Sequence, residues 1–116
     1  PGVTLFIVLD HPESVFMRLL EKTAPMYYAR SLNAHRTIEG LHEHGYRMEK
    51  TEFDTHLVNP LGLEDERRDA VLSLLCYRDF RALDSETRSW VGAVVSEHER
   101  SGQIVCKCVC YELMRG

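Results

Sequence analysis

The sequence lacks an excess of positive charge. It has 14 lysines and arginines against 18 aspartates and glutamates, which gives a formal net charge of −4. Proteins that bind nucleic acid generally need a basic surface to meet the phosphates. The arginines are scattered and have acidic neighbours, as in "LEDERRDA". We therefore expect that nucleic acid is not the partner. Binding of nucleic acid on an exposed, locally basic sheet face is kept as an alternative function.

No apolar run is long enough to cross a membrane. The longest, "VTLFIVL" at positions 3–9, has the length of a strand, whereas a transmembrane helix needs roughly 20 residues. The first residues contain neither a charged leader nor a small-residue cleavage site, so we expect no targeting peptide. The sequence predicts no membrane partner and an intracellular protein, cytoplasmic or nuclear.

The sequence motifs of common catalytic and nucleotide-binding sites are also missing. None of the serines lies in a G-x-S-x-G elbow, and there is no G-x-G-x-x-G or Walker-type loop. We therefore expect no nucleotide or other cofactor, and we assign no catalytic residue. These absences favour a non-enzymatic role.

Cysteine is present but not in a disulfide pattern. Three of the four cysteines alternate in "QIVCKCVCYELM", at positions 106, 108 and 110. Residues i and i+2 on a strand lie about 6.5–7 Å apart with parallel side chains, which is poor geometry for a disulfide. We therefore expect reduced cysteines, as in an intracellular protein.

The same cysteines raise the question of a metal site. Zinc-binding pairs commonly have C-x₂₋₄-C spacing on a turn, which this straight run lacks. Cys106 and Cys108 remain candidate ligands if Cys76 and His98 complete a site in the fold. A reactive thiol needs a positive neighbour, and Lys107 points to the opposite face. The pattern favours small buried residues beneath a helix.

A second metal candidate is "LHEHGYR", where His42 and His44 are two positions apart. On a strand they would share a face, similar to the His-hydrophobic-His motif of rolling-circle replication nucleases, but Glu43 replaces the hydrophobic residue. A small metal-dependent hydrolase or nuclease, helped by His56 or Asp54, is therefore an alternative function. If a helix continues through this stretch, the two histidines lie about 200° apart, and a polar helix end is favoured.

Hydrophobic periodicity predicts the first half of the chain. The run at 3–9 predicts a strand covered on both faces. A short helix to about Lys22 follows, capped by Asp10 or His11 with Pro12 in its first turn. A second helix starts with a Thr23 cap and stops at Gly45. A strand around 53–57 with one wet face and a helix over about 65–78 come next.

The last third allows two interpretations. Residues 86–98 form either a helix capped by Asp84 or Ser85, or a strand that starts near Trp90 and pairs with the final run. Valine density and the Ser-Gly bend favour the hairpin. The final strand, 103–114, is apolar on both faces, which indicates a central strand, although an edge position stays open.

The predicted architecture is a single α+β domain over residues 1–116. It has about four mainly antiparallel strands, two to three helices packed on one face, and a C-terminal β-hairpin. The predicted function is protein–protein interaction, regulatory in kind, with a homodimer through the C-terminal hairpin and the Tyr27/Tyr28 helix as the expected assembly. A final strand at an edge would pair with another chain, and aromatic and arginine residues are enriched in interface cores. The candidate interface residues are Tyr27, Tyr28, Arg30, Trp90, Val109, Tyr111 and Leu113.

Overall fold

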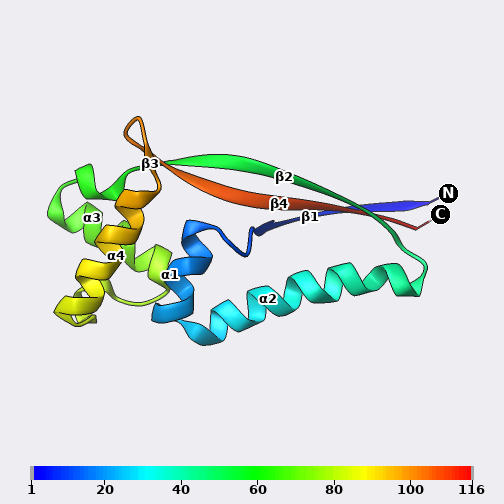
Figure 1. The fold of residues 1–116 in the computed structure, drawn as a ribbon, viewed down its shortest axis with the longest axis horizontal. Coiled ribbons are helices and arrows are strands. Elements are labelled where there is room, and N and C mark those ends of the chain that lie inside the picture. Colours follow the sequence, from blue (N-terminus) through cyan, green and yellow to red (C-terminus); the bar gives the residue numbers. More distant parts are fainter. Residues whose placement is uncertain (1, 116) are drawn as a thin grey trace.

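A computed structural model describes residues 2–115 and folds them as one antiparallel sheet with four α-helices (Figure 1). The elements in chain order are β1 (Val3–Asp10), α1 (Val15–Thr23), α2 (Pro25–Gly40), β2 (Arg47–Val58), α3 (Asp65–Cys76), α4 (Ser85–Glu97), β3 (Glu99–Arg100) and β4 (Gln103–Arg115). Short 3-10 helices connect them: η1 (Leu41–His44), η2 (Pro60–Gly62) and η3 (Phe80–Ala82). The α+β class and the C-terminal hairpin are confirmed.

Strand β4 is the centre of the sheet, whose order is β1-β4-β2. It pairs antiparallel with β1 along its second half and with β2 along almost all of its length. The short β3 pairs with its first two residues. The final strand is therefore central, and it offers no free edge to another chain. The outer strands are β1 and β2.

The buried side of β4 changes along its length. In the first half, the even-numbered Ile104 and Cys106 pack against α1, α3 and α4. In the second half, the odd-numbered Val109, Tyr111 and Leu113 pack against α2. The pairing register has no inserted residue, so the twist of the long strands, not a bulge, turns the other face toward the helices. At the α2 end, the even-numbered face of β4 therefore has no helix over it.

Strand β1 differs from its expected place. Its continuous apolar run predicted a strand covered on both faces, but β1 is an outer strand with mostly exposed residues. Only Ile7, Leu9 and Asp10 are partly buried, and the first two contact the cluster beneath α2. The structure therefore leaves apolar surface where the sequence predicted a core.

The start of α1 is fixed by a residue that the sequence analysis did not choose. Ser14 caps the helix, and its hydroxyl accepts a hydrogen bond from the Met17 N–H at 3.2 Å. The predicted caps, Asp10 and His11, lie too early because β1 runs through Asp10. A side-chain oxygen at this position satisfies one of the free N–H groups of the first turn.

Thr23 was also predicted as a cap and has another role. It is the last residue of α1, and its hydroxyl donates to the backbone carbonyls of Leu19 and Cys76. This bond ties α1 to the end of α3. Helix α2 ends at Gly40, earlier than predicted. Gly45, with a φ of 87°, instead ends the 3-10 turn η1 in the left-handed conformation.

Residues 85–97 form the helix α4, so the expected strand from Trp90 is wrong. Asp84 caps the helix and accepts a hydrogen bond from the Thr87 N–H at 2.7 Å. Helical spacing then places three valines on one buried face, and this packing outweighs the β-propensity of valine. The three are Val91, Val94 and Val95.

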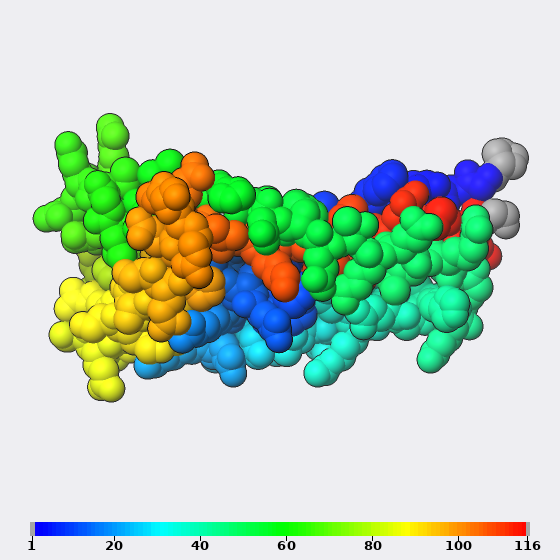
Figure 2. All heavy atoms as spheres, turned by 45° about the horizontal axis from the view of Figure 1, so that its top comes forward, coloured from blue at the N-terminus to red at the C-terminus, as the bar shows by residue number. Residues whose placement is uncertain are grey.

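The molecule is elongated, with extents of 52 × 30 × 20 Å and a radius of gyration of 16.6 Å. A compact domain of this length has a radius of gyration of about 13 Å. Figure 2 shows the lobe that contains α4 at one end and the strands that carry the termini at the other. The lobe of α1, α3 and α4 covers one end of the sheet, and α2 lies along the rest of the same side. None of the helices within residues 2–115 has the length and apolar character needed to cross a membrane.

Candidate interaction surface

The outer edge of β1 carries backbone groups that have no partner among residues 2–115. The His11 N–H donates to the Lys107 carbonyl at 3.0 Å, in continuation of the β1–β4 register. Hydrogen-bonded and non-hydrogen-bonded positions alternate in an antiparallel pair, so the odd residues of β1 bond to β4. The N–H and C=O groups of Thr4, Phe6 and Val8 therefore point away from the sheet.

One end of this edge is closed by α2. Asp10 follows the same alternation, and its carbonyl accepts a hydrogen bond from His35 Nε2 at 2.7 Å. Desolvation raises the pKa of the Asp10 carboxyl, and the nearby His35 opposes this shift. The free edge therefore spans Thr4 to Val8, because α2 blocks any continuation toward Asp10.

His35 is the centre of a buried network beneath the sheet. Its Nδ1 lies 2.7 Å from the oxygen of the Tyr111 hydroxyl, and the proton of that hydroxyl is donated to the Glu39 carboxylate at 3.1 Å. Lys50 Nζ lies 3.4 Å from the same carboxylate. Burial, and then the Glu39 charge, raise the pKa of Tyr111 to about 12. The network holds α2 against β1, β4 and β2.

The side chains of β1 are as open as its backbone. The exposed fractions are 68% for Val3, 54% for Leu5, 64% for Phe6 and 57% for Val8. No residue from Val3 to Leu9 is charged. Outer strands are usually protected from pairing with other chains by charges, prolines or bulges. Strand β1 carries none of these along its register.

The other outer strand, β2, provides the contrast. Its 12 residues include charged side chains on both faces, such as Arg47, Glu49, Lys50, Glu52 and Asp54. These are the residues expected on an edge that stays in water. The two edges of one sheet therefore differ, and only β1 has the composition of a strand that is covered.

The sheet face opposite α2 extends the apolar surface. Val8 lies directly opposite Cys110, which is half-buried. Phe53 of β2 is 38% exposed and lies opposite Cys108 on the same face. We call this surface the uncovered face; its apolar members are Phe6, Val8, Phe53, Cys110 and Met114.

Charges divide the uncovered face. Glu112 lies directly opposite Phe6 on one side and Glu49 on the other. Two like charges opposite each other in a sheet are destabilising unless water screens them. Arg47 lies on the same face at the next position of β2. This arrangement keeps the β2 side of the face wet, and it gathers no basic patch for nucleic acid.

Three of the predicted interface residues are in the core. Val109 and Tyr111 are fully buried, and Leu113 is 4% exposed. They contact Ile38 of α2, because the twist of β4 turns this face inward. They are not available to another chain.

The remaining predicted interface residues lie on the helices. Trp90 packs partly against the main core, and Lys22 Nζ lies 4.7 Å from the centre of its ring. Tyr28 is partly buried beside Met17 and Leu20.

Tyr27 is 46% exposed, and its ring stacks on that of Tyr77 at a centroid distance of 4.8 Å. The Arg30 guanidinium covers the Tyr27 ring at 5.6 Å. This exposed aromatic pair is a second surface, separate from β1.

The candidate metal ligands are not brought together. Cys106 and Cys108 are buried in the sheet. Burial raises the pKa of Cys106 to about 11, which keeps it a thiol at neutral pH, whereas metal ligation and nucleophilic attack need a thiolate. Within residues 2–115, no three histidine, cysteine or acidic side chains form a possible metal site.

The histidine pair lies in a short helical turn rather than on a strand. His42 and His44 belong to η1, where residues two apart point in different directions. Asp54 and His56, the proposed helpers, are exposed on β2. The shared face that chelation requires is therefore absent from this turn.

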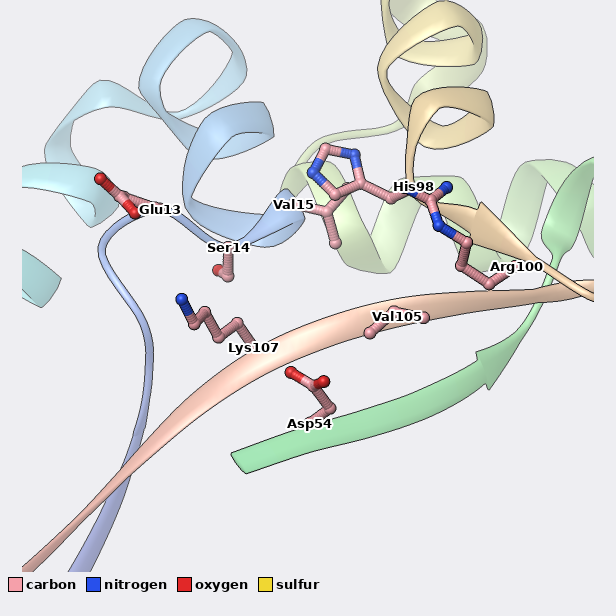
Figure 3. A pocket seen from close by; sticks show the side chains of 8 residues that line it. All are labelled: Glu13, Ser14, Val15, Asp54, His98, Arg100, Val105 and Lys107. Atoms are coloured by element: carbon pink, nitrogen blue, oxygen red, sulfur yellow. The ribbon is translucent and has the colours of Figure 1, made fainter. Parts of the chain in front are cut away.

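A cleft of about 400 Å³ lies between the sheet and the ends of α1 and α4. Figure 3 shows Lys107 reaching from β4 toward the start of α1, with Asp54 beside it on β2. The cleft mixes these charges with Glu13 and Arg100, so it favours neither an anion nor a cation.

Two groups in the cleft resemble catalytic residues but are already occupied. The Ser14 hydroxyl caps α1, and His98 Nδ1 bonds to the Val94 carbonyl at 2.9 Å. They do not form the hydrogen-bonded nucleophile and base pair that acyl transfer requires.

Sequence reasoning missed the residues of β1 as a candidate surface, although the signal was present. An uncharged apolar strand needs other residues packed on both faces, and the sequence analysis expected those residues to come from this same chain. The sequence matches no protein-family model and no curated protein.

Proposed function

We propose that this chain is a non-enzymatic protein-interaction module that self-associates. Its surface is β1 with the adjoining part of the uncovered face. The observation that carries the proposal is the outer edge of β1, where free backbone groups and exposed, uncharged side chains lie in one line. Such an edge is a template for pairing with another chain.

The side chains that pairing would cover set the scale of the free energy of self-association. Fully burying a valine, leucine or phenylalanine side chain contributes roughly 1.5–3 kcal/mol relative to exposure. Each copy exposes Val3, Leu5, Phe6 and Val8. Association costs an estimated 4–15 kcal/mol in lost freedom. Edge pairing covers these side chains only in part, so the two ranges overlap. The test is designed around a dissociation constant on the order of micromolar, which corresponds to about −8 kcal/mol.

The test is the mass of the protein in solution, measured by sedimentation equilibrium. Concentrations between roughly 1 and 100 µM cover the range in which a micromolar dissociation constant would show. The wild type should be dimeric at the upper end. Phe6→Lys should be monomeric throughout, because it places a charge at the centre of the apolar edge. Its far-ultraviolet circular dichroism should match the wild type, since Phe6 is exposed.

Tyr27→Lys is the matched control. It makes the same aromatic-to-lysine change at an exposed site on the helical surface, so it should leave the dimer intact. A wild type that stays monomeric over this range would overturn the proposal. Loss of the dimer in Tyr27→Lys alone would move the interface to the helices.

A further inference from the structure

We infer that the partner strand is β1 of a second copy, antiparallel to the first, with Phe6 opposite Phe6 across a twofold axis. The inference rests on the proposed self-association and specifies its geometry. It selects pairing at the edge over packing between two sheet faces, and it fixes one register.

The first argument is the self-complementarity of β1. A symmetric antiparallel pair places residues opposite each other at equal distances from the centre. Centred on Phe6, the run "VTLFIVL" matches apolar or β-branched residues at every step, and such cross-strand pairs stabilise sheets. The pairs are Phe6 with Phe6, Leu5 with Ile7, Thr4 with Val8, and Val3 with Leu9.

The second argument is the position of the free backbone groups. The N–H and C=O groups of Thr4, Phe6 and Val8 point outward, because the odd residues bond to β4. A register centred on Phe6 pairs Phe6 with itself and Thr4 with Val8, so all these groups gain partners. A register centred on Ile7 needs the Asp10 carbonyl, which already accepts from His35. One centred on Leu5 leaves Val8 outside the central pairs.

The third argument excludes packing between two uncovered faces. Such packing would remove Glu49 and Glu112 from water. These carboxylates lie opposite each other, and among residues 2–115 neither forms an ion pair. Burying unpaired charges costs several kcal/mol per ion. Edge pairing leaves both carboxylates in solvent and still covers Phe6 and Val8 at their flanks.

The assembly is a continuous sheet in the order β2-β4-β1-β1-β4-β2. The two charged β2 strands become its outer edges, which is where charges protect a sheet from further pairing. The twofold axis stands perpendicular to the sheet, so both α2 helices lie on the same side. The assembly therefore closes as a dimer and does not extend into a fibre.

The experiment is disulfide trapping in a glutathione redox buffer, read by non-reducing electrophoresis. Each variant adds one cysteine to a Cys110→Ser protein, because Cys110 lies directly opposite Val8 in the same copy. Directly opposed residues in an antiparallel pair have Cα atoms about 4.5–5.5 Å apart, within disulfide range. Phe6→Cys should therefore cross-link with itself. Leu5→Cys and Ile7→Cys should each cross-link at least about ten-fold more slowly, because their own copies lie roughly 8 Å apart.

Two mixtures test the same register in other ways. Leu5→Cys mixed with Ile7→Cys should form a heterodisulfide. Thr4→Cys mixed with Val8→Cys should do so as well. Both mixtures keep the Phe6 side chain, which the Phe6→Cys variant removes. The Cys110→Ser protein, whose remaining cysteines are all buried, provides the background.

The outcomes separate this inference from the proposed function. Fastest self-linking by Leu5→Cys or Ile7→Cys in a dimeric protein overturns the register and leaves self-association intact. A dimer in which no β1 variant cross-links overturns β1 pairing as a whole. Loss of the dimer in Phe53→Lys, which changes the uncovered face on β2, would favour face packing. A monomeric wild type overturns the proposed function itself.

Discussion

At the scale of single residues, Tyr111 shows how a polar group is kept in the core. Its side chain is fully buried, and its hydroxyl contacts both His35 and Glu39. A buried hydroxyl without partners would cost about 1–3 kcal/mol. The same bonds fix His35, whose other nitrogen closes the β1 edge at Asp10. One buried network therefore decides where the free edge ends.

The raised pKa of Tyr111 predicts loss of stability at alkaline pH. The pKa rises from 10.0 to about 12 in the fold, so the folded state favours the protonated hydroxyl. This contribution is complete below pH 10 and is lost as pH rises through about 12, by at most about 3 kcal/mol.

The measurement is urea unfolding at several pH values between 8 and 11.5, roughly the span of the shift. The free energy of unfolding should fall more steeply for the wild type than for Tyr111→Phe, which lacks the ionisable group. The difference between the two proteins should shrink as pH rises. Parallel curves would show that Tyr111 does not titrate with folding.

At the scale of elements, the start of α1 matters because the chain turns there from the β1 edge into the helical lobe. Ser14 is 2% exposed and caps this turn. We predict that Ser14→Ala lowers the free energy of unfolding by about 1 kcal/mol, since the Met17 N–H loses its acceptor.

Ser31→Ala is the control, because Ser31 lies inside α2 and forms no cap. Alanine has the higher helix propensity, so this change should leave stability equal or slightly higher. Thermal unfolding of both variants checks the pair. Equal losses in the two would mean that the serine hydroxyl at position 14 does not stabilise the helix start.

Elements with strong periodicity could be predicted from the sequence. Helix α3 and strand β4 were both found from the pattern of apolar residues. The segment at 85–97 was assigned as strand because valine favours strands locally. Burial of Val91, Val94 and Val95 on one helical face decided otherwise, and such tertiary packing is invisible in a local pattern.

The candidate surface could not be predicted from the sequence for a related reason. An apolar run such as that of β1 reports that cover is needed, not which chain supplies it. The parity rule placed the three cysteines of β4 on one face. The twist of the strand then buried Cys106 and Cys108 and left Cys110 on the uncovered side. Accumulated twist is a property of the whole sheet and leaves no local signal.

At the scale of the whole molecule, elongation and function are connected. The molecule is 52 Å long, and the helices of one chain leave the β1 edge and the uncovered face of its sheet open. The two edges of the sheet differ in composition, because β2 carries charged side chains and β1 carries none from Val3 to Leu9. The account's central claim is that the uncharged edge pairs with a second copy.

Amide hydrogen exchange of β1 as a function of protein concentration tests that claim most directly. Leu5, Ile7 and Leu9 bond to β4, so their amides should be protected at every concentration and serve as internal controls. The amides of Thr4, Phe6 and Val8 should exchange freely in dilute protein and become protected where the dimer forms. Free exchange of the Phe6 and Val8 amides in a protein that is dimeric by mass would contradict the account.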